Sequence, residues 1–237
     1  MRRIHLAPIR PVLAALVESG RFRLILTFVL IGAAGFAGLD IADRYAEMEG
    51  TNLPFWFSLS EEGSFAEWFE YALTAAAAGA MLSAWTRRRA PILAVASFFY
   101  LWLMLDNALG LHEAGGRLLA PLLAFTGEAG TDLSAVGEVA VFGVTGIAFG
   151  AATLWALTGD SPRANSAGLV VIVIAALAAP FGIGVDLGHE LLPENSILLA
   201  EAMGFIEDFG ELLALAIGSA AALAYRAWQD DARSTHF

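Results

Sequence analysis

Six long apolar segments dominate this sequence and restrict its fold more than any other feature. The hydrocarbon core of a bilayer is about 30 Å thick, so a helix rising about 1.5 Å per residue needs about 20 residues to cross it. Only 16% of the 237 residues are charged and 58% are hydrophobic, whereas soluble domains carry about 25% charged residues. The sequence therefore predicts an all-α integral membrane bundle of six transmembrane helices, with spans at 24–43, 65–86, 91–112, 134–157, 168–190 and 200–226.

These spans predict one membrane domain, residues 24–227, flanked by two short segments. Residues 1–23 carry five arginines around an apolar stretch that is too short to span. This composition favours a cytoplasmic amphipathic helix that lies on the bilayer surface. Residues 228–237 are expected to form a cytoplasmic tail.

The placement of arginine predicts the orientation of the bundle. The chain has no lysine, so all 13 basic residues are arginines. Eleven lie at the two termini or in the second and fourth connections between spans, and only Arg44 and Arg117 lie on the opposite side. Because basic residues are enriched in cytoplasmic loops, both termini are expected to be cytoplasmic. Arginine-only, alanine-rich usage is typical of bacteria, which predicts a bacterial inner membrane protein.

The acidic residues show the opposite bias and repeat along the chain. Twenty of the 24 lie in non-cytoplasmic connections or in the outer parts of spans. Each outgoing span ends in acids, and each returning span has a glutamate in its first turns. Glutamates in these matched positions are 23, 25 and 21 residues apart, in the pairs Glu47 and Glu70, Glu113 and Glu138, and Glu190 and Glu211. The similar spacing predicts three weakly repeated helical hairpins.

The outer acids, together with two histidines, predict a metal-binding cup open to the periplasmic side. Acids at a helix carboxyl terminus oppose the helix dipole, and two arginines cannot neutralise so many carboxylates. A bound cation, or protonation of several carboxylates, must balance the remaining negative charge. His112 and His189 end corresponding spans, and each precedes a glutamate. The predicted metal ligands are Glu70, His112, Glu113, Glu138, His189, Glu190 and Glu211.

Further acids are expected to support these ligands. Asp106 is predicted to share a helix face with Glu113, and Asp186 with His189 and Glu190. We assign Asp106 and Asp186 the catalytic role of orienting ligands or moving protons. Acids near enough to assist them are Glu47, Glu207 and Asp208.

Nitrogen and oxygen ligands without sulfur suit iron, manganese or zinc. The chain has no cysteine, which excludes thiolate chemistry, and no lysine, which excludes a Schiff base. Two histidines with several carboxylates resemble the ligand sets of di-iron and di-manganese bundles. We therefore expect one or two divalent metal ions in a membrane enzyme, an oxidoreductase or a hydrolase, that acts on a lipid or another apolar substrate.

Two alternatives remain open at this point. Acids inside a membrane also mark ion pathways, which would indicate a divalent-cation or proton-coupled transporter. The chain could instead be a non-catalytic subunit bound to membrane partner subunits. Nucleic-acid binding is not expected, because the acidic side carries no basic patch.

Small residues and prolines predict details of the packing. Close helix packing is expected at glycines spaced three or four residues apart, namely Gly32, Gly35 and Gly38, Gly146 and Gly150, and Gly184 and Gly188. Pro180 should kink the fifth span. The outer loop 115–132 contains an apolar stretch that is expected either to lie on the membrane surface or to cover the acids as a lid.

Overall fold

A computed structural model of the protein describes residues 3–123, 133–185 and 197–234. All regular secondary structure in these ranges is helical, which confirms the all-α class. The elements are α1 (Ile9–Glu18), α2 (Gly20–Met48), η1 (Phe55–Phe57), α3 (Phe65–Arg88), α4 (Pro91–Leu109), α5 (Leu111–Leu123), α6 (Leu133–Ala156), α7 (Pro162–Ala176), η2 (Pro180–Val185) and α9 (Ile197–Ser234).

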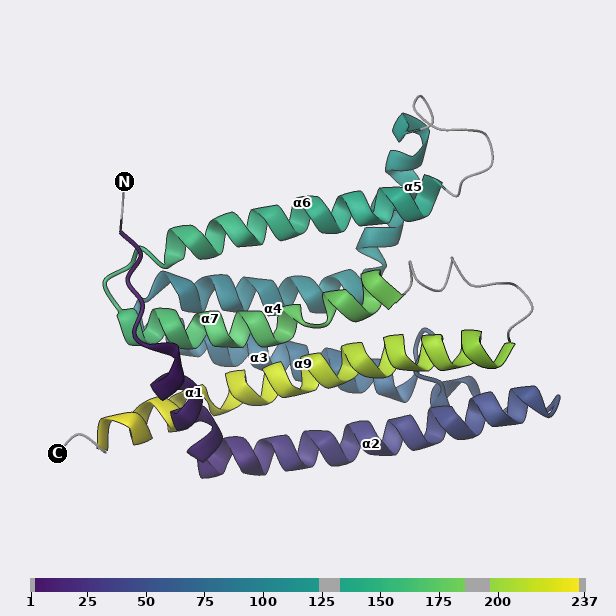
Figure 1. Ribbon diagram of the computed structural model, residues 1–237, viewed down its shortest axis with the longest axis horizontal. Coiled ribbons are helices and arrows are strands. Elements are labelled where there is room, and N and C mark those ends of the chain that lie inside the picture. Colours follow the sequence, from purple (N-terminus) through teal and green to yellow (C-terminus); the bar gives the residue numbers. More distant parts are fainter. Residues whose placement is uncertain (1–2, 124–132, 186–196, 235–237) are drawn as a thin grey trace.

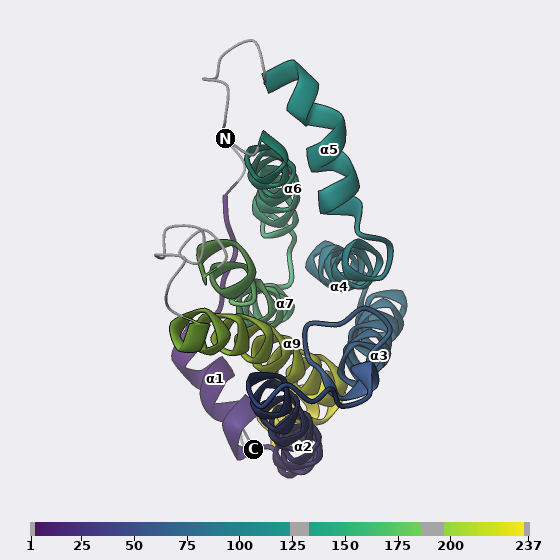
Figure 2. The same cartoon turned by 90° about the vertical axis from the view of Figure 1, so that its right-hand side faces the viewer.

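The helices α2, α3, α4, α6, α7 and α9 run along a common direction (Figure 1), and α9 lies between α2 and α7. Helix α9 packs against α2, α3 and α7, and α4 packs against α3 and α7. The short α1 crosses the bundle near the end of α9, while α5 leans away from the bundle beside α6 (Figure 2). The expected hairpin of spans 24–43 and 65–86 is not reproduced as a tightly packed pair, because α2 contacts α9 far more extensively than α3.

In the part of the chain that the structure describes, four helices are long and apolar enough to cross a membrane: Gly20–Met48, Pro91–Leu109, Val136–Ala156 and Pro162–Val185. The remaining two expected spans, 65–86 and 200–226, are helical but interrupted by charge. The uncharged run between Glu70 and Arg87 is sixteen residues long, and that between Glu211 and Arg226 is fourteen. Six spans are thus not confirmed, because α3 and α9 carry charged residues where a full-length span would be apolar.

Helix α4 ends earlier than the predicted span 91–112. Gly110 adopts a left-handed conformation, with φ of 54°, and ends α4 after Leu109. Glycine tolerates this conformation because it has no Cβ. His112 and Glu113 therefore belong to α5, and the prediction that Asp106 and Glu113 share one helix face was wrong.

The apolar stretch of the predicted outer loop is helical as far as Leu123. Helix α5 packs closely on α6, and a Cβ added at Gly137 would overlap the backbone of Gly116. The rest of the loop, 124–132, lies outside the described residues. A helix leaning on α6 therefore replaces the expected loop in the part that the structure describes.

The remaining sequence predictions have mixed outcomes. Helix α7 ends at Ala176, and a π-helical turn begins at Pro180, as expected of a proline that breaks the regular helix. Helix α9 continues to Ser234, so it extends into the predicted tail 228–237. Within the predicted N-terminal segment 1–23, residues 9–18 form α1, which buries Val12 and Leu16 against the bundle, and α2 begins at Gly20.

The predicted glycine packing is realised only in part. A Cβ at Gly32 would lie 3.0 Å from the ring of Phe69, which indicates close helix packing. A Cβ at any of Gly35, Gly38, Gly146, Gly150 or Gly184 would meet nothing within 4 Å. These glycines therefore do not pack a second helix within the described part of the chain, and Gly188 lies outside it.

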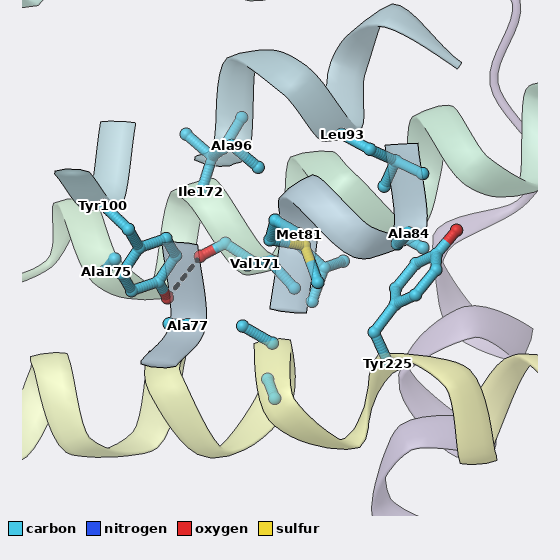
Figure 3. Close-up of a cluster of buried hydrophobic side chains, with 14 of the residues drawn as sticks. Ala77, Met81, Ala84, Leu93, Ala96, Tyr100, Val171, Ile172, Ala175 and Tyr225 are labelled. Atoms are coloured by element: carbon cyan, nitrogen blue, oxygen red, sulfur yellow. Dashed lines mark hydrogen bonds between the residues drawn. The ribbon is translucent and has the colours of Figure 1, made fainter. Parts of the chain in front are cut away.

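The core is built from small residues on α3, α4, α7 and α9 (Figure 3). Ala77 and Ala175 are fully buried, and the Tyr100 hydroxyl donates a hydrogen bond of 3.4 Å to the backbone oxygen of Val171. A Cβ at Gly218 would lie 2.5 Å from that hydroxyl. The alanines and Gly218 at these positions let the helices approach closely.

Candidate functional site

A cavity of about 570 Å³ lies among α4, α5, α6, α9 and the α7–η2 segment. We call it the acidic cavity. Part of its wall is apolar and includes Phe99, Trp102, Leu103, Phe142, Phe149 and Leu215. Another part is polar and consists of Asp106, Asn107, His112, Glu113, Glu138, Thr145, Glu207 and Glu211. Four predicted metal ligands and one predicted catalytic residue therefore line one cavity.

Asp106 and His112 form the best-defined contact in this cavity. The break at Gly110 folds the chain back so that the His112 amide donates to Asp106 Oδ1 at 3.0 Å. The His112 Nδ1 lies 3.1 Å from Asp106 Oδ2. Asp106 is buried, and the imidazole stacks on the ring of Phe142 with centroids 4.8 Å apart. The carboxylate and the ring together fix the plane of the histidine.

This contact also controls the proton of His112, which lies beyond the end of the α4 span. The hydrogen bond to Asp106 raises the pKa of the imidazole above its ordinary value, while burial opposes the shift. Glu113 and Glu138 add to the increase through their negative charges. When the ring is neutral, a proton on Nδ1 is the tautomer that donates to the Asp106 carboxylate. In that tautomer Nε2 keeps a free lone pair.

Glu211 reaches the cavity through a close contact between α9 and the π-helical turn. A Cβ added at Gly182 would overlap Glu211 Oε1, and a Cβ at Gly210 would overlap the ring of Phe181. The glycines at 182 and 210 therefore let the two segments approach. Both the π-helical turn and the absence of a side chain at 182 make room for the Glu211 carboxylate.

Glu70 does not line the cavity, but it contacts a residue that does. Its Oε1 accepts a hydrogen bond of 2.5 Å from Asn107 Nδ2, and Asn107 lines the cavity. Glu211 is close enough to Glu70 and Asp106 to interact with both electrostatically. Sequence reasoning missed Asn107, although a polar amide directly after Asp106 in an apolar helix was a usable signal.

Glu113 lines the cavity but also has a partner on its own helix. Its Oε2 accepts a hydrogen bond from Arg117 at 3.2 Å, in an exposed i,i+4 ion pair. Such a pair contributes little to stability. Glu113 is thus placed at the solvent-facing rim.

A second group of acids gathers around Arg44, which we call the Arg44 cluster. Its guanidinium contacts carboxylate oxygens of Asp40 at 2.7 Å, Glu201 at 3.0 Å and Asp208 at 2.8 Å. Asp40 is fully buried and also accepts a hydrogen bond of 2.7 Å from the Leu59 amide. The outer acids therefore do not converge on one centre, and Asp208, expected near the metal, binds Arg44. Neither Asp208 nor Glu47 lines the acidic cavity.

The predicted metal centre is not assembled in the part of the chain that the structure describes. No three His, Asp or Glu side chains in this part are grouped closely enough to hold a metal ion. Two predicted ligands, His189 and Glu190, and the predicted catalytic residue Asp186 lie outside the described residues. The donor types around the acidic cavity, imidazole nitrogen and carboxylate oxygen, do suit iron, manganese or zinc.

These features define a class: an all-helical protein with four helices able to cross a membrane and an acid-lined cavity among them. The chain belongs to the family described as a domain of unknown function (DUF8692), which matches residues 11–226. No curated protein and no solved structure matches it. The match includes every described residue that lines the acidic cavity.

Proposed function

We propose that this protein is a metal-dependent enzyme of the bacterial inner membrane, with one or two divalent ions bound in the acidic cavity. The cavity faces the periplasm and both termini are cytoplasmic, as the arginine bias suggests. The observation that carries this proposal is the contact between His112 Nδ1 and Asp106 Oδ2 at 3.1 Å. Metal-binding histidines typically donate their second N–H to a carboxylate in this way.

The residues around this pair supply the remaining donors. Glu138 is among the charges that act on His112, and Glu211 lines the same cavity. We propose that His112 Nε2 and these two carboxylates come together on a metal ion when it binds, because they are not grouped closely enough to hold one in the described residues; Glu113 would lie at the rim. Glu70 would act through Asn107 rather than as a direct ligand. His189 and Glu190 stay predicted ligands, with Asp186 as their supporting acid.

The walls of the acidic cavity fit an apolar substrate with one polar, reacting end. Aromatic side chains such as Phe99 and Phe149, whose ring centroids are 5.1 Å apart, form the apolar part. A lipid tail bound there would exclude water from the polar end. The metal would supply an activated water or oxygen species. Asp106 would hold the tautomer and orientation of His112, and the glutamates would accept or return protons.

Elemental mass spectrometry of the detergent-purified protein tests this proposal. The wild type should retain about one or two equivalents of iron, manganese or zinc. His112→Ala should lose most of it, and Asp106→Asn should weaken metal affinity by about 10–100-fold, as loss of a ligand's supporting partner does. Glu61→Gln, which removes an exposed outer carboxylate away from the cavity, is the matched control. Wild-type protein that retains no metal, or equal losses in the control, would contradict the proposal.

One observation favours the alternative of a subunit in a larger membrane complex. Helix α6 is little buried within the chain, and a Cβ at Gly143, Gly146 or Gly150 would meet nothing within 4 Å. Such open small-residue faces accept partner helices in membranes. A stoichiometric partner that co-purifies and is lost in Gly143→Leu, with metal content near zero, would support the subunit. Metal uptake into liposomes would instead support the transporter.

A further inference from the structure

A second cavity lies at the opposite end of the bundle, where the arginines gather. It has a volume of about 720 Å³ and is lined by Ala7, Arg87, Arg88, Ser161, Pro162, Arg163 and Ala164. We call it the arginine pocket. Its wall joins the N-terminal segment, the end of α3 and the α6–α7 turn. None of its described lining residues is acidic.

Hydrogen bonds fix the wall formed by the N-terminal segment and the α6–α7 turn. The Ala7 amide donates to the Pro162 oxygen at 3.2 Å, and the Ser166 hydroxyl donates to the Ala7 oxygen at 2.8 Å. The buried Asn165 side chain donates to the backbone oxygens of His5 at 2.8 Å and Gly159 at 2.9 Å. The segment before α1 is therefore held against the turn, and the pocket wall is fixed by bonds to buried side chains.

The arginines are placed by the end of α3. Arg89 adopts a left-handed conformation, with φ of 55°, which ends the helix directly after Arg87 and Arg88. The Arg88 guanidinium lies 5.9 Å from the ring centroid of the buried Tyr225. Arg163 comes from the first turn of α7, 75 residues further along the chain than Arg88. The positive-inside rule explains arginines on this side, but it does not predict that two separate turns bring three of them into one pocket.

The chemistry of the pocket is that of a phosphate-binding site. A guanidinium matches the geometry of phosphate oxygens and binds them with two parallel hydrogen bonds. The pocket also adjoins the amino terminus of α7, where the helix dipole favours an anion. The Ser161 side chain makes no capping hydrogen bond there, so its hydroxyl is available to a ligand.

We propose that the arginine pocket binds the phosphate group of an anionic phospholipid from the cytoplasmic leaflet. The pocket lies at the end of two helices able to cross a membrane, Val136–Ala156 and Pro162–Val185. A phosphate here is therefore at the depth where lipid headgroups begin. Basic pockets between membrane helices on the cytoplasmic side bind such headgroups.

Native mass spectrometry of the protein in mixed phosphatidylglycerol and phosphatidylcholine micelles tests the proposal. The wild type should retain phosphatidylglycerol selectively. The double variant Arg87→Gln/Arg163→Gln should lower that affinity by about tenfold or more, since two guanidinium groups leave the site. The control Arg10→Gln/Arg89→Gln removes the same charge from two exposed positions outside the lining of the pocket, and should retain the wild-type affinity.

Competition with inorganic phosphate distinguishes the two possible sources of the bound phosphate group, a lipid headgroup and free phosphate. Lipid retention that millimolar phosphate does not displace supports a lipid site, whereas phosphate binding without lipid selectivity overturns it. Equal losses in the test and control variants would also overturn it, because they would indicate general surface electrostatics. The single variant Arg163→Gln, with an unchanged melting temperature, gives the same test if the double variant does not fold.

Discussion

The acidic cavity and the Arg44 cluster hold carboxylates near the same end of the bundle in two different ways. In the Arg44 cluster, one guanidinium lies within 3.0 Å of three carboxylates from α2 and α9. Among the described residues that line the acidic cavity, the only basic side chain is His112. A permanently charged guanidinium is suited to joining two helices. An imidazole can gain or lose its proton, so the charge of the acidic cavity can change with pH. The first group therefore stabilises the fold, and the second is the candidate for chemistry.

The largest expected effect comes from removing the cation of the Arg44 cluster. Arg44→Met leaves the buried Asp40 without its ion partner, so the free energy of unfolding should fall by about 3 kcal/mol. Thermal unfolding in detergent measures this change. Arg117→Met, which breaks the exposed pair with Glu113, should change stability by less than about 1 kcal/mol. Equal effects of the two variants would contradict the conclusion that the Arg44 cluster stabilises the fold.

The double variant Arg44→Met/Asp40→Asn sharpens this comparison. It removes the buried charge together with its partner, so it should recover part of the stability lost by Arg44→Met alone. No recovery would show that Arg44 acts through packing rather than charge.

A smaller effect is expected at the contact between the π-helical turn and α9. Gly182→Ala places a methyl group on Glu211 Oε1, so overpacking should cost about 1–3 kcal/mol and displace the carboxylate. Gly184→Ala in the same turn meets nothing within 4 Å and should be close to neutral. Metal content and melting temperature should fall together in the first variant only. Matching results for both glycines would show that the turn does not position Glu211.

The smallest effect is a shift in pH dependence at His112. Because Asp106 raises the folded-state pKa of His112, metal should bind the imidazole only as the pH rises through that raised value. Asp106→Asn should therefore move the midpoint of metal uptake to lower pH. In the metal-free protein, the stability changes with pH in the opposite direction to metal binding. The pair of Asp106 with protonated His112 stabilises the fold at low pH, and this stabilisation is lost as the pH rises through the folded-state pKa of His112.

NMR measurement of the His112 pKa checks this shift. Proton titration of the His112 ring by NMR gives its pKa directly, and His112→Gln assigns the signal. An unchanged midpoint in Asp106→Asn would show that Asp106 does not control the proton of His112.

Sequence patterns located the four helices able to cross a membrane and the ionisable residues that line the acidic cavity, because both depend on local composition. Apolar runs predicted the helices, and acids at helix ends predicted the acid-lined region that contains Asp106, His112, Glu138 and Glu211. The boundary of α4 was missed because a single left-handed glycine, Gly110, decides it. A pattern of apolar residues does not reveal such a conformation.

Pairing between helices was harder to predict because it depends on distant contacts. Arg44 meets Asp208, which is 164 positions away in the chain, and the hairpin repeat gave no sign of that pairing. The repeat predicted which end each acid occupies, but the partner of each acid depends on how α2 docks on α9. Asn107 was missed because a neutral amide does not stand out by charge.

The short uncharged runs of α3 and α9 have a consequence for the surrounding lipid. At about 1.5 Å per residue, runs of sixteen and fourteen residues cover only about 24 Å and 21 Å of a hydrocarbon layer about 30 Å thick. If α3 and α9 cross the bilayer as the sequence predicts, the surrounding lipids must thin locally to relieve this hydrophobic mismatch. Acyl chain length in the host bilayer should thus change how deeply Glu70 and Glu211 are immersed.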